Sequence, residues 1–151
     1  MIRLIALLTV SVLLLPIRAD AEDPFAVPDE VRAACVEWGR YYGIDPGLLG
    51  AICWKESRFR YAENGRYKGL MQIDVNLHSG RLNNLGISDI SDPSQAVHAG
   101  ASLLWDISDH GKKEAAVALL GYSGSGGTRM TAYVRSVLEL AAQYDERGTF
   151  N

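Results

Sequence analysis

Histidine and cysteine are scarce in this chain, which argues against a protein built around a metal. The 151 residues include three histidines and two cysteines. His78, His98 and His110 are far apart and lack the spacing of metal ligands, so they are best interpreted as ordinary surface or loop residues. Cys35 and Cys53 alone make a poor pair of metal ligands. We therefore expect neither a bound metal nor another cofactor.

A surplus of positive charge is also missing. The chain has 15 Lys and Arg against 18 Asp and Glu, a formal net charge of -3 at pH 7. Proteins that bind nucleic acid or an anionic membrane surface usually carry a basic surplus. The composition therefore favours neither of these as a partner.

Long apolar runs are confined to the start of the chain. Residues 1–3 form a short basic start and residues 4–17 are almost wholly apolar. Ala19 and Ala21 then supply small side chains at alternate positions. This is the three-part layout of a secretory signal peptide. The apolar run is shorter than the ~20 residues that span a bilayer. We predict a signal peptide at residues 1–21, cleavage after Ala21, and a mature protein with no stable membrane anchor.

The mature chain has the size of one compact domain. Cleavage after Ala21 would leave 130 residues with 13 basic and 17 acidic side chains and no internal repeat. Residues 22–27 are polar and contain proline, so we expect a flexible N-terminus there. Residues 28–151 are expected to form the folded domain, and the protein is expected to be a monomer.

Helical signals recur along the mature chain. Helix starts and ends are marked by aspartate or threonine caps, prolines at first positions and closing glycines, and they predict helices over residues 28–42, 46–59, 93–110 and 112–120. A last helix, which Thr128 can cap, is predicted from apolar positions that recur between Met130 and Ala141. Over residues 69–74, Leu70, Gln72 and Asp74 alternate with Met71 and Ile73, and this weak period of two predicts a short extended segment. The pattern indicates a mainly α fold of about five helices around one core.

The helix expected after Asp45 carries a carboxylate on its apolar face. At helical spacing, Glu56 falls in one stripe with Leu48, Leu49, Ile52 and Cys53. Burial disfavours the ionised form of a carboxyl group and raises its pKa, so that it can hold a proton near neutral pH and deliver it. The alternative is a structural glutamate paired with an arginine or lysine.

The two cysteines are placed for a disulfide. Cys35 lies eight residues before Gly43 and Cys53 eight residues after Asp45, so an antiparallel hairpin of the first two helices brings them to matching heights. An exported chain reaches an oxidising compartment in which such a pair tends to bridge. In the chain-entropy model a loop of this length contributes roughly 3 kcal/mol to stability.

Several short motifs follow one another in a recognisable order. They are Glu56-Ser57-Arg58-Phe59, Gly69-Leu70-Met71-Gln72-Ile73, Asp92-Pro93 with Ala99-Gly100, a tyrosine loop around Tyr122, and Tyr133-Val134. Together, from about residue 31 to residue 144, they resemble the soluble lytic transglycosylase domain, which is similar to goose-type lysozyme. The small size and the early cysteine most resemble the subgroup associated with secretion and pilus machineries.

The resemblance implies an α+β lysozyme-like fold and an enzyme of the periplasm that cuts peptidoglycan. In this family the glutamate that matches Glu56 protonates the oxygen between N-acetylmuramic acid and N-acetylglucosamine and then acts as a base. The 6-hydroxyl of the muramic acid attacks its own anomeric carbon, which leaves a 1,6-anhydro end. The implied partners are peptidoglycan strands and components of a secretion or pilus machinery.

The resemblance also implies substrate-binding residues, drawn from the two central motifs and the two tyrosines: Ser57, Gly69, Met71, Gln72, Tyr122 and Tyr133. The tyrosine hydroxyls are expected close to the glutamate. A core methionine and a turn-bonding glutamine are the alternatives for Met71 and Gln72. The chain departs from the family at Ser123, where asparagine is usual, and at Tyr67, where serine is common.

Asp74 is a candidate second carboxylate. Retaining glycosidases hold their two carboxyl groups roughly 5 to 5.5 Å apart and inverting ones roughly 6.5 to 9.5 Å apart. At either distance Asp74 would allow hydrolysis as in lysozyme, whereas the simpler interpretation is an exposed aspartate that caps a turn before Asn76. The remaining alternative is a factor that binds peptidoglycan or assists assembly without catalysis.

Overall fold

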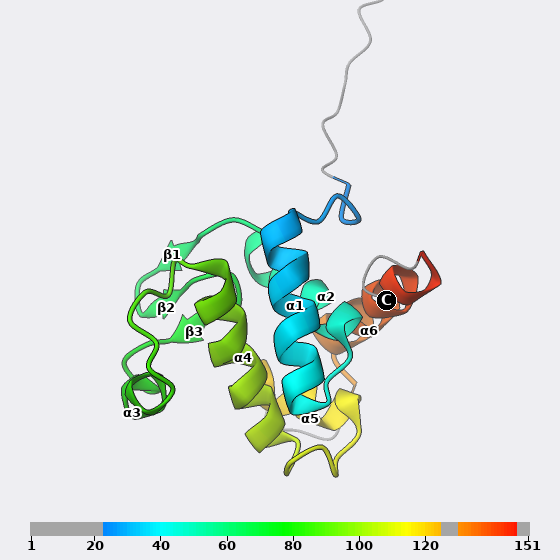
Figure 1. The fold of residues 1–151 in the computed structure, drawn as a ribbon. Coiled ribbons are helices and arrows are strands. Elements are labelled where there is room, and N and C mark those ends of the chain that lie inside the picture. The colour runs from blue at the N-terminus through cyan, green and yellow to red at the C-terminus, as the bar shows by residue number, and fades with distance from the viewer. Residues whose placement is uncertain (1–22, 125–129, 148–151) are drawn as a thin grey trace, which may run out of the picture.

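The computed structural model describes residues 23–124 and 130–147, which form a mainly helical domain with a small sheet (Figure 1). The elements in chain order are α1 (Asp29–Tyr42), α2 (Pro46–Ser57), β1 (Glu63–Asn64), β2 (Tyr67–Lys68), β3 (Ile73–Asp74), α3 (Ser79–Asn84), α4 (Pro93–Ile107), α5 (Ala115–Tyr122) and α6 (Ala132–Glu146). The predicted mainly α fold is confirmed. The signal peptide predicted at residues 1–21 lies outside the described residues.

The helix starts follow the capping residues in the sequence. The Asp45 carboxylate accepts from the backbone N–H groups of Gly47 at 2.6 Å and Leu48 at 3.2 Å. The Asp92 carboxylate accepts from the N–H of Gln95 at 2.8 Å. A proline stands in the first turn of each helix, where its missing N–H costs nothing. These caps fix where α2 and α4 begin.

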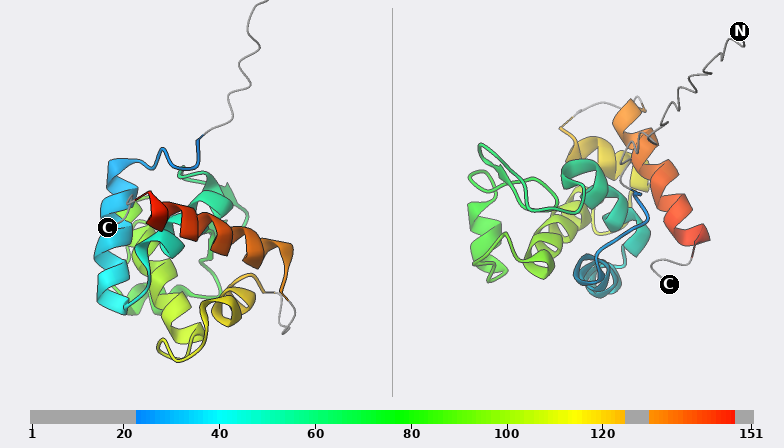
Figure 2. Two further views of the ribbon diagram at one scale, coloured as in Figure 1. Left: turned by 90° about the vertical axis from the view of Figure 1, so that its right-hand side faces the viewer. Right: turned by 90° about the horizontal axis from the view of Figure 1, so that it is seen from above.

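Helix α2 lies at the centre of the domain. It packs against α1 on one side and α6 on another, and α1 also packs along α4 (Figures 1 and 2). Every residue from 47 to 53 is buried, including Ala51, which is outside the expected apolar stripe. The residues that precede Glu56 in α2 are buried as predicted, but helices on several sides of α2 bury them, so the buried surface is wider than one stripe.

The sheet is a three-stranded antiparallel meander at one side of the domain. Its order is β1-β2-β3, with Tyr67 opposite Asp74 and Lys68 opposite Ile73. Only the last two residues of the extended segment expected at 69–74 are a strand. The six-residue α3 is the helix that the sequence did not predict, because it is too short for apolar periodicity to be visible.

A glycine in α4 allows the loop before β3 to pack tightly on the core. A Cβ atom placed on Gly100 would lie 2.2 Å from the sulfur of Met71. Met71 itself is fully buried. The side chain of Met71 therefore fills the core against the backbone of α4, which is the alternative given above for this residue.

The two cysteines meet between α1 and α2 as expected, but as free thiols. Cys35 and Cys53 are both buried. A hydrogen bond with Cys35, followed by burial, raises the pKa of the Cys53 thiol well above its ordinary value. No bond joins the two sulfurs in the structure. Packing brings the sulfurs together, whereas the redox compartment decides whether they are oxidised. The disulfide stays a prediction.

The residues before α1 run across the end of α6. Phe25 packs edge-on against Tyr144 with ring centroids 5.2 Å apart, and the guanidinium of Arg147 lies 3.8 Å from the centre of the Phe25 ring. The buried Tyr144 donates a hydrogen bond to the carbonyl of Pro24. The segment expected to be flexible thus makes these contacts from residue 24 onward. Within the described part of the chain, no helix has the length and apolar character needed to cross a membrane.

Candidate active site

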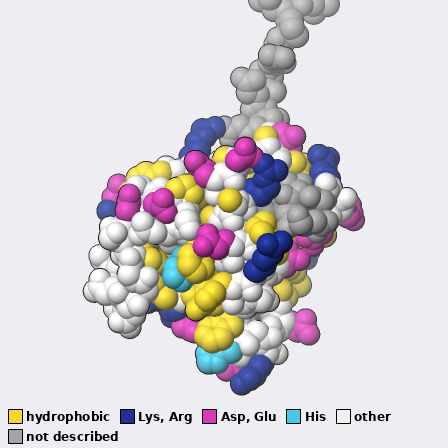
Figure 3. Space-filling view, in the orientation of Figure 1, with side chains coloured by type: hydrophobic (Ala, Val, Ile, Leu, Met, Phe, Trp, Pro, Cys, Tyr) yellow, Lys and Arg dark blue, Asp and Glu magenta, His cyan; other side chains and the backbone are white. Residues whose placement is uncertain are grey.

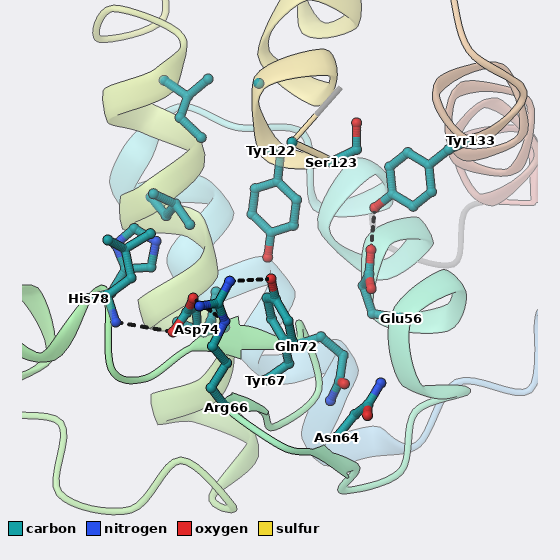
Figure 4. Close-up of a pocket in the computed structure, with 16 residues that line it drawn as sticks. Glu56, Asn64, Arg66, Tyr67, Gln72, Asp74, His78, Tyr122, Ser123 and Tyr133 are labelled. Carbon is teal, nitrogen blue, oxygen red and sulfur yellow. Dashed lines mark hydrogen bonds and ion pairs between the residues drawn. The ribbon is translucent and has the colours of Figure 1, made fainter. Parts of the chain in front are cut away.

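A cavity of about 770 Å³ opens between the sheet and helices α4, α5 and α6 (Figure 4). Its volume lies in the range typical of ligand sites, roughly 300 to 1,000 Å³. The lining residues come from every one of these elements and from the end of α2: Glu56, Asn64, Arg66, Tyr67, Gln72, Ile73, Asp74, Leu77, His78, Leu103, Ile107, Gly121, Tyr122, Ser123, Gly124 and Tyr133. Four of the predicted site residues beyond Glu56 are among them, namely Gln72, Asp74, Tyr122 and Tyr133.

Glu56 stands in the last turn of α2 and points to Tyr133 of α6 (Figure 4). The Tyr133 hydroxyl donates to Oε1 of Glu56 at 2.6 Å. Burial raises the pKa of the Glu56 carboxyl, and this outweighs the hydrogen bond from Tyr133 and the charge of Lys55, which lower it. The hydrogen-bond partner of Glu56 among the described residues is thus a hydroxyl, not the arginine or lysine of the structural alternative.

Tyr133 keeps its proton over the whole physiological range. Burial and the bond to Glu56 raise the pKa of its phenol far above the ordinary value. A phenol that stays protonated is always a donor, so it stabilises the carboxylate form of Glu56 more than the acid form. The arrangement gives a carboxyl group that can release a proton and keep a partner afterwards.

Tyr122 acts on the floor of the cavity and not on Glu56. Its hydroxyl donates to the backbone carbonyl of Met71 at 2.8 Å. Burial raises the pKa of the Tyr122 phenol well above its ordinary value, so this donor is also permanent. Of the two tyrosine hydroxyls expected close to the glutamate, that of Tyr133 bonds Glu56 directly, whereas that of Tyr122 bonds Met71 instead.

Gln72 and Gly69 shape the turn that forms this floor. Gln72 has a backbone φ of 49°, and its side-chain amide donates to the carbonyls of Ala62 and Gly69, both at 3.0 Å. Gly69 has a φ of 79°, and a Cβ there would lie 2.8 Å from the carbonyl oxygen of Ile90. Left-handed backbone at a non-glycine residue is uncommon and strained, and it persists where the surrounding contacts hold it. Gln72 both bonds the turn and lines the cavity.

Ser57 is placed elsewhere. Its hydroxyl donates to the carbonyl of Cys53 one turn earlier, at 2.9 Å, and it does not line the cavity. Gly69 and Met71 are likewise buried and absent from the lining. These three predicted residues therefore lie outside the cavity lining.

Asp74 lies on the sheet side of the cavity with both carboxylate oxygens engaged. Its Oδ2 is 2.9 Å from Nε of Arg66, and its Oδ1 accepts from the backbone N–H of Leu77 at 3.0 Å (Figure 4). Arg66 also donates to the Tyr67 hydroxyl at 3.2 Å. The side chain is 7% exposed. Asp74 thus caps a turn, as the simpler interpretation expected, but it is buried at the cavity and not exposed.

Sequence reasoning missed several lining residues. Asn64 lies on β1, Arg66 lies in the turn between β1 and β2, and His78, which we interpreted as an ordinary surface or loop residue, reaches the cavity from the turn before α3. Burial lowers the pKa of the His78 imidazole, which favours its neutral form. No spacing in the sequence marks these positions, because the pairing of β1, β2 and β3 brings them to the cavity. In residues 23–124 and 130–147 no three or more His, Cys, Asp or Glu side chains gather as a metal site would require.

Comparison with known proteins finds a family whose model matches this chain. The family model described as "Transglycosylase SLT domain" matches residues 34–143. Three curated Escherichia coli proteins named "X polypeptide", one of them from strain K12, are each 41% identical to the chain over 75 residues. The match covers 44% of this chain and 44% of each relative, so the chain aligns with less than half the length of these proteins. No solved structure matches.

Proposed function

Since the chain belongs to the transglycosylase SLT domain family, we propose that it is a peptidoglycan lytic transglycosylase with Glu56 as its catalytic acid and base. The observation that carries this proposal is the half-buried Glu56 carboxyl, which opens on the cavity and is hydrogen-bonded to Tyr133. Its raised pKa favours the protonated form that an acid catalyst needs at rest.

The chemistry that we propose uses one carboxyl group twice. Glu56 donates its proton to the β-1,4 glycosidic oxygen between N-acetylmuramic acid and N-acetylglucosamine as that bond breaks. The resulting carboxylate then accepts the proton of the muramic acid 6-hydroxyl, whose oxygen bonds to the anomeric carbon. The products are a free 4-hydroxyl end and a 1,6-anhydro end, and Glu56 is protonated again.

Tyr133 has a clear role in this sequence of steps. When Glu56 has given up its proton, the carboxylate is left in a partly desolvated place, which is unfavourable. The phenol at 2.6 Å then stabilises the negative charge and holds the oxygen that must accept the next proton. Tyr133 is therefore a positioning residue for Glu56.

Hydrolysis in the manner of lysozyme is the second candidate, because Asp74 lines the same cavity. Against it, Arg66 and the N–H of Leu77 already occupy both Asp74 oxygens. Mass spectrometry of the digested glycan separates the two, since anhydro ends lack the water that hydrolysis adds. Asp74→Ala that still forms anhydro ends at the normal rate would remove Asp74 from the mechanism.

The decisive variant is Glu56→Gln, which keeps the shape of the side chain and removes the transferable proton. We expect the wild type to clear peptidoglycan in a zymogram and the variant to be inactive. Clearing by both proteins would refute the proposed role of Glu56. Clearing by neither would favour the non-catalytic alternative, a factor that binds peptidoglycan or assists assembly.

We further propose that the enzyme is exported to the periplasm, where it opens the wall locally for a secretion or pilus machinery. The support is the predicted signal peptide and the resemblance to the small subgroup. Fractionation of cells that produce the full chain tests the location, and co-purification of machinery components tests the partnership.

A further inference from the structure

A continuous chain of aromatic rings lies on the surface formed by α1 and α4. We call it the aromatic belt and define it by its members: Trp38, Tyr41, Tyr42, His98, Trp105 and His110. Neighbouring ring centroids are 3.6 to 5.9 Å apart along the belt. Hydrophobic and histidine side chains run down this face of the molecule (Figure 3).

The belt borders a hollow that is separate from the active-site cavity. The hollow has a volume of about 450 Å³ and is lined by Tyr41, Tyr42, Leu85, Ser102, Trp105 and Asp106. None of these residues lines the cavity around Glu56, to which α4 contributes Leu103 and Ile107. Because of helical spacing, one face of α4 lines the active-site cavity and another face lines the hollow.

Part of the belt holds the fold together. Trp38 stacks on His98 at 3.6 Å with an interplanar angle of 3°, and its indole N–H donates to Ser94 at 2.9 Å. Tyr42 and His98 form a hydrogen bond of 3.0 Å. These three rings join α1 to α4 and need no ligand to explain them.

The rings around the hollow are different. Tyr41 is 73% exposed and meets Tyr42 edge-on at 4.8 Å. Trp105 is only half-buried, between Tyr42 at 5.8 Å and His110 at 4.0 Å. Large exposed aromatic side chains that gather at one place commonly mark a binding surface.

The polar groups at the rim are held in fixed positions. Arg81 pairs with Oδ2 of Asp106 at 2.7 Å and donates to the Ser102 hydroxyl at 2.9 Å. The other Asp106 oxygen lies 3.7 Å from His110. A few oriented polar groups beside aromatic faces are the usual composition of a small-ligand site.

We propose that the aromatic belt binds a glycan strand at the hollow beside Tyr41 and Trp105. The C–H faces of pyranose rings pack on aromatic faces, and the Asp106 carboxylate, whose side chain is 43% exposed, can accept a hydrogen bond from a sugar hydroxyl. The choice of peptidoglycan as this polymer rests on the proposed function, whereas the binding step does not use Glu56. A second contact to an insoluble polymer raises the local concentration of the cavity near its substrate.

A glycan fits this surface better than a protein partner does. Stable protein interfaces bury roughly 800 Å² on each side around an apolar centre with few charges. Here the hollow is small, and Asp106 and Arg81 form an ion pair at its edge. Sugar rings need only a few aromatic faces with polar groups beside them.

The test measures sedimentation with insoluble peptidoglycan in a Glu56→Gln background, so that the polymer is not cut. Tyr41→Ala and Trp105→Ala should each weaken binding about fivefold. Tyr61→Ala is the matched control, because Tyr61 is 48% exposed and lines neither opening; it should bind as the parent does. A soluble N-acetylglucosamine hexamer should protect the Trp105 indole from a fluorescence quencher, and Tyr41→Ala should reduce this protection.

Equal binding of peptidoglycan by Tyr41→Ala and the parent would overturn the inference. A belt variant that binds peptidoglycan normally but no longer binds a protein that the parent binds would overturn it as well. Thermal unfolding checks that each variant is folded, and if Trp105→Ala is not, Tyr41→Ala alone decides. The two proposals fail separately. A wild type that does not cut glycan but pellets in a belt-dependent way refutes the proposed function alone. A wild type that cuts glycan while the belt variants bind normally refutes this inference alone.

Discussion

Removing the Tyr133 hydroxyl tests how the protonation of Glu56 is controlled. Burial raises the Glu56 pKa, and the hydrogen bond from Tyr133 is the largest effect that lowers it. Tyr133→Phe removes this opposing effect and keeps the ring. The Glu56 pKa in the variant should therefore be higher than in the wild type.

The size of the change follows from the bond that is lost. A hydrogen bond to a charged group contributes about 1.5 to 3 kcal/mol. One pKa unit corresponds to about 1.36 kcal/mol of difference between the two protonation states. Because Glu56 is half-buried and water partly replaces the lost donor, we take the lower end of that range, about 1.5 kcal/mol, as the stabilisation that the carboxylate loses.

The assay is the pH dependence of peptidoglycan clearing. An acid catalyst works only when protonated, so activity falls as the pH rises through the Glu56 pKa. In Tyr133→Phe this alkaline limb should move to higher pH, because the pKa of Glu56 is raised further when the donor is lost. The rate at the optimum should fall about tenfold, because the carboxylate that forms during the reaction is less stabilised.

Tyr122→Phe is the matched control. Its hydroxyl bonds the carbonyl of Met71 and not Glu56, so it should reduce the rate without moving the alkaline limb. An unchanged or lowered alkaline limb in Tyr133→Phe would refute the reasoning, and so would equal shifts in both variants.

Three further predictions concern stability. Gly100→Ala forces a Cβ onto the sulfur of Met71 and should cost about 1 to 3 kcal/mol in urea unfolding; an unchanged midpoint would show that the loop yields freely. Burial and the neighbouring Asp45 raise the pKa of the Asp145 carboxyl, so the folded state binds this proton more tightly than the unfolded chain, and ionisation destabilises the fold above the ordinary aspartate pKa. Asp145→Asn should therefore raise Tm at pH 7 and not at pH 3, and equal effects at both pH values would speak against it. If the two buried cysteines bridge after oxidation, a reductant should remove about 3 kcal/mol of stability, whereas two thiols titrated in the oxidised protein would rule the bridge out.

Local signals in the sequence predicted the starts of α2 and α4 well, whereas α5 and α6 begin later than expected, and the cap of α6 is Thr131. The cap predicted at Thr128 lies outside the described residues. Asp45 and Asp92 accept hydrogen bonds from the first turns of α2 and α4, as their positions before proline indicated. Such caps act within a few residues, so no tertiary information is needed to recognise them. The polar stretch after α2 was different, because strands of two residues and a six-residue helix carry no readable period.

The site was predictable only in part. Glu56 stood out because a carboxylate among apolar residues is unusual, although its burial comes from helices on several sides of α2. Tyr133 was tied to it through the family resemblance and not through any spacing. Arg66 reaches the cavity because two short hairpin strands turn it there, and Tyr41 meets Trp105 at one hollow because α1 packs along α4. Long-range packing of this kind leaves no local pattern.

The bond between Glu56 and Tyr133 has a consequence for the timing of activity. It joins residues that are 77 positions apart, and its second member belongs to α6, the last helix in the part of the chain that the structure describes. A nascent or truncated chain that ends before α6 has the proposed acid but neither the hydroxyl that stabilises its carboxylate nor the helix that buries it. We therefore expect a chain that lacks α6 to be inactive in the proposed reaction.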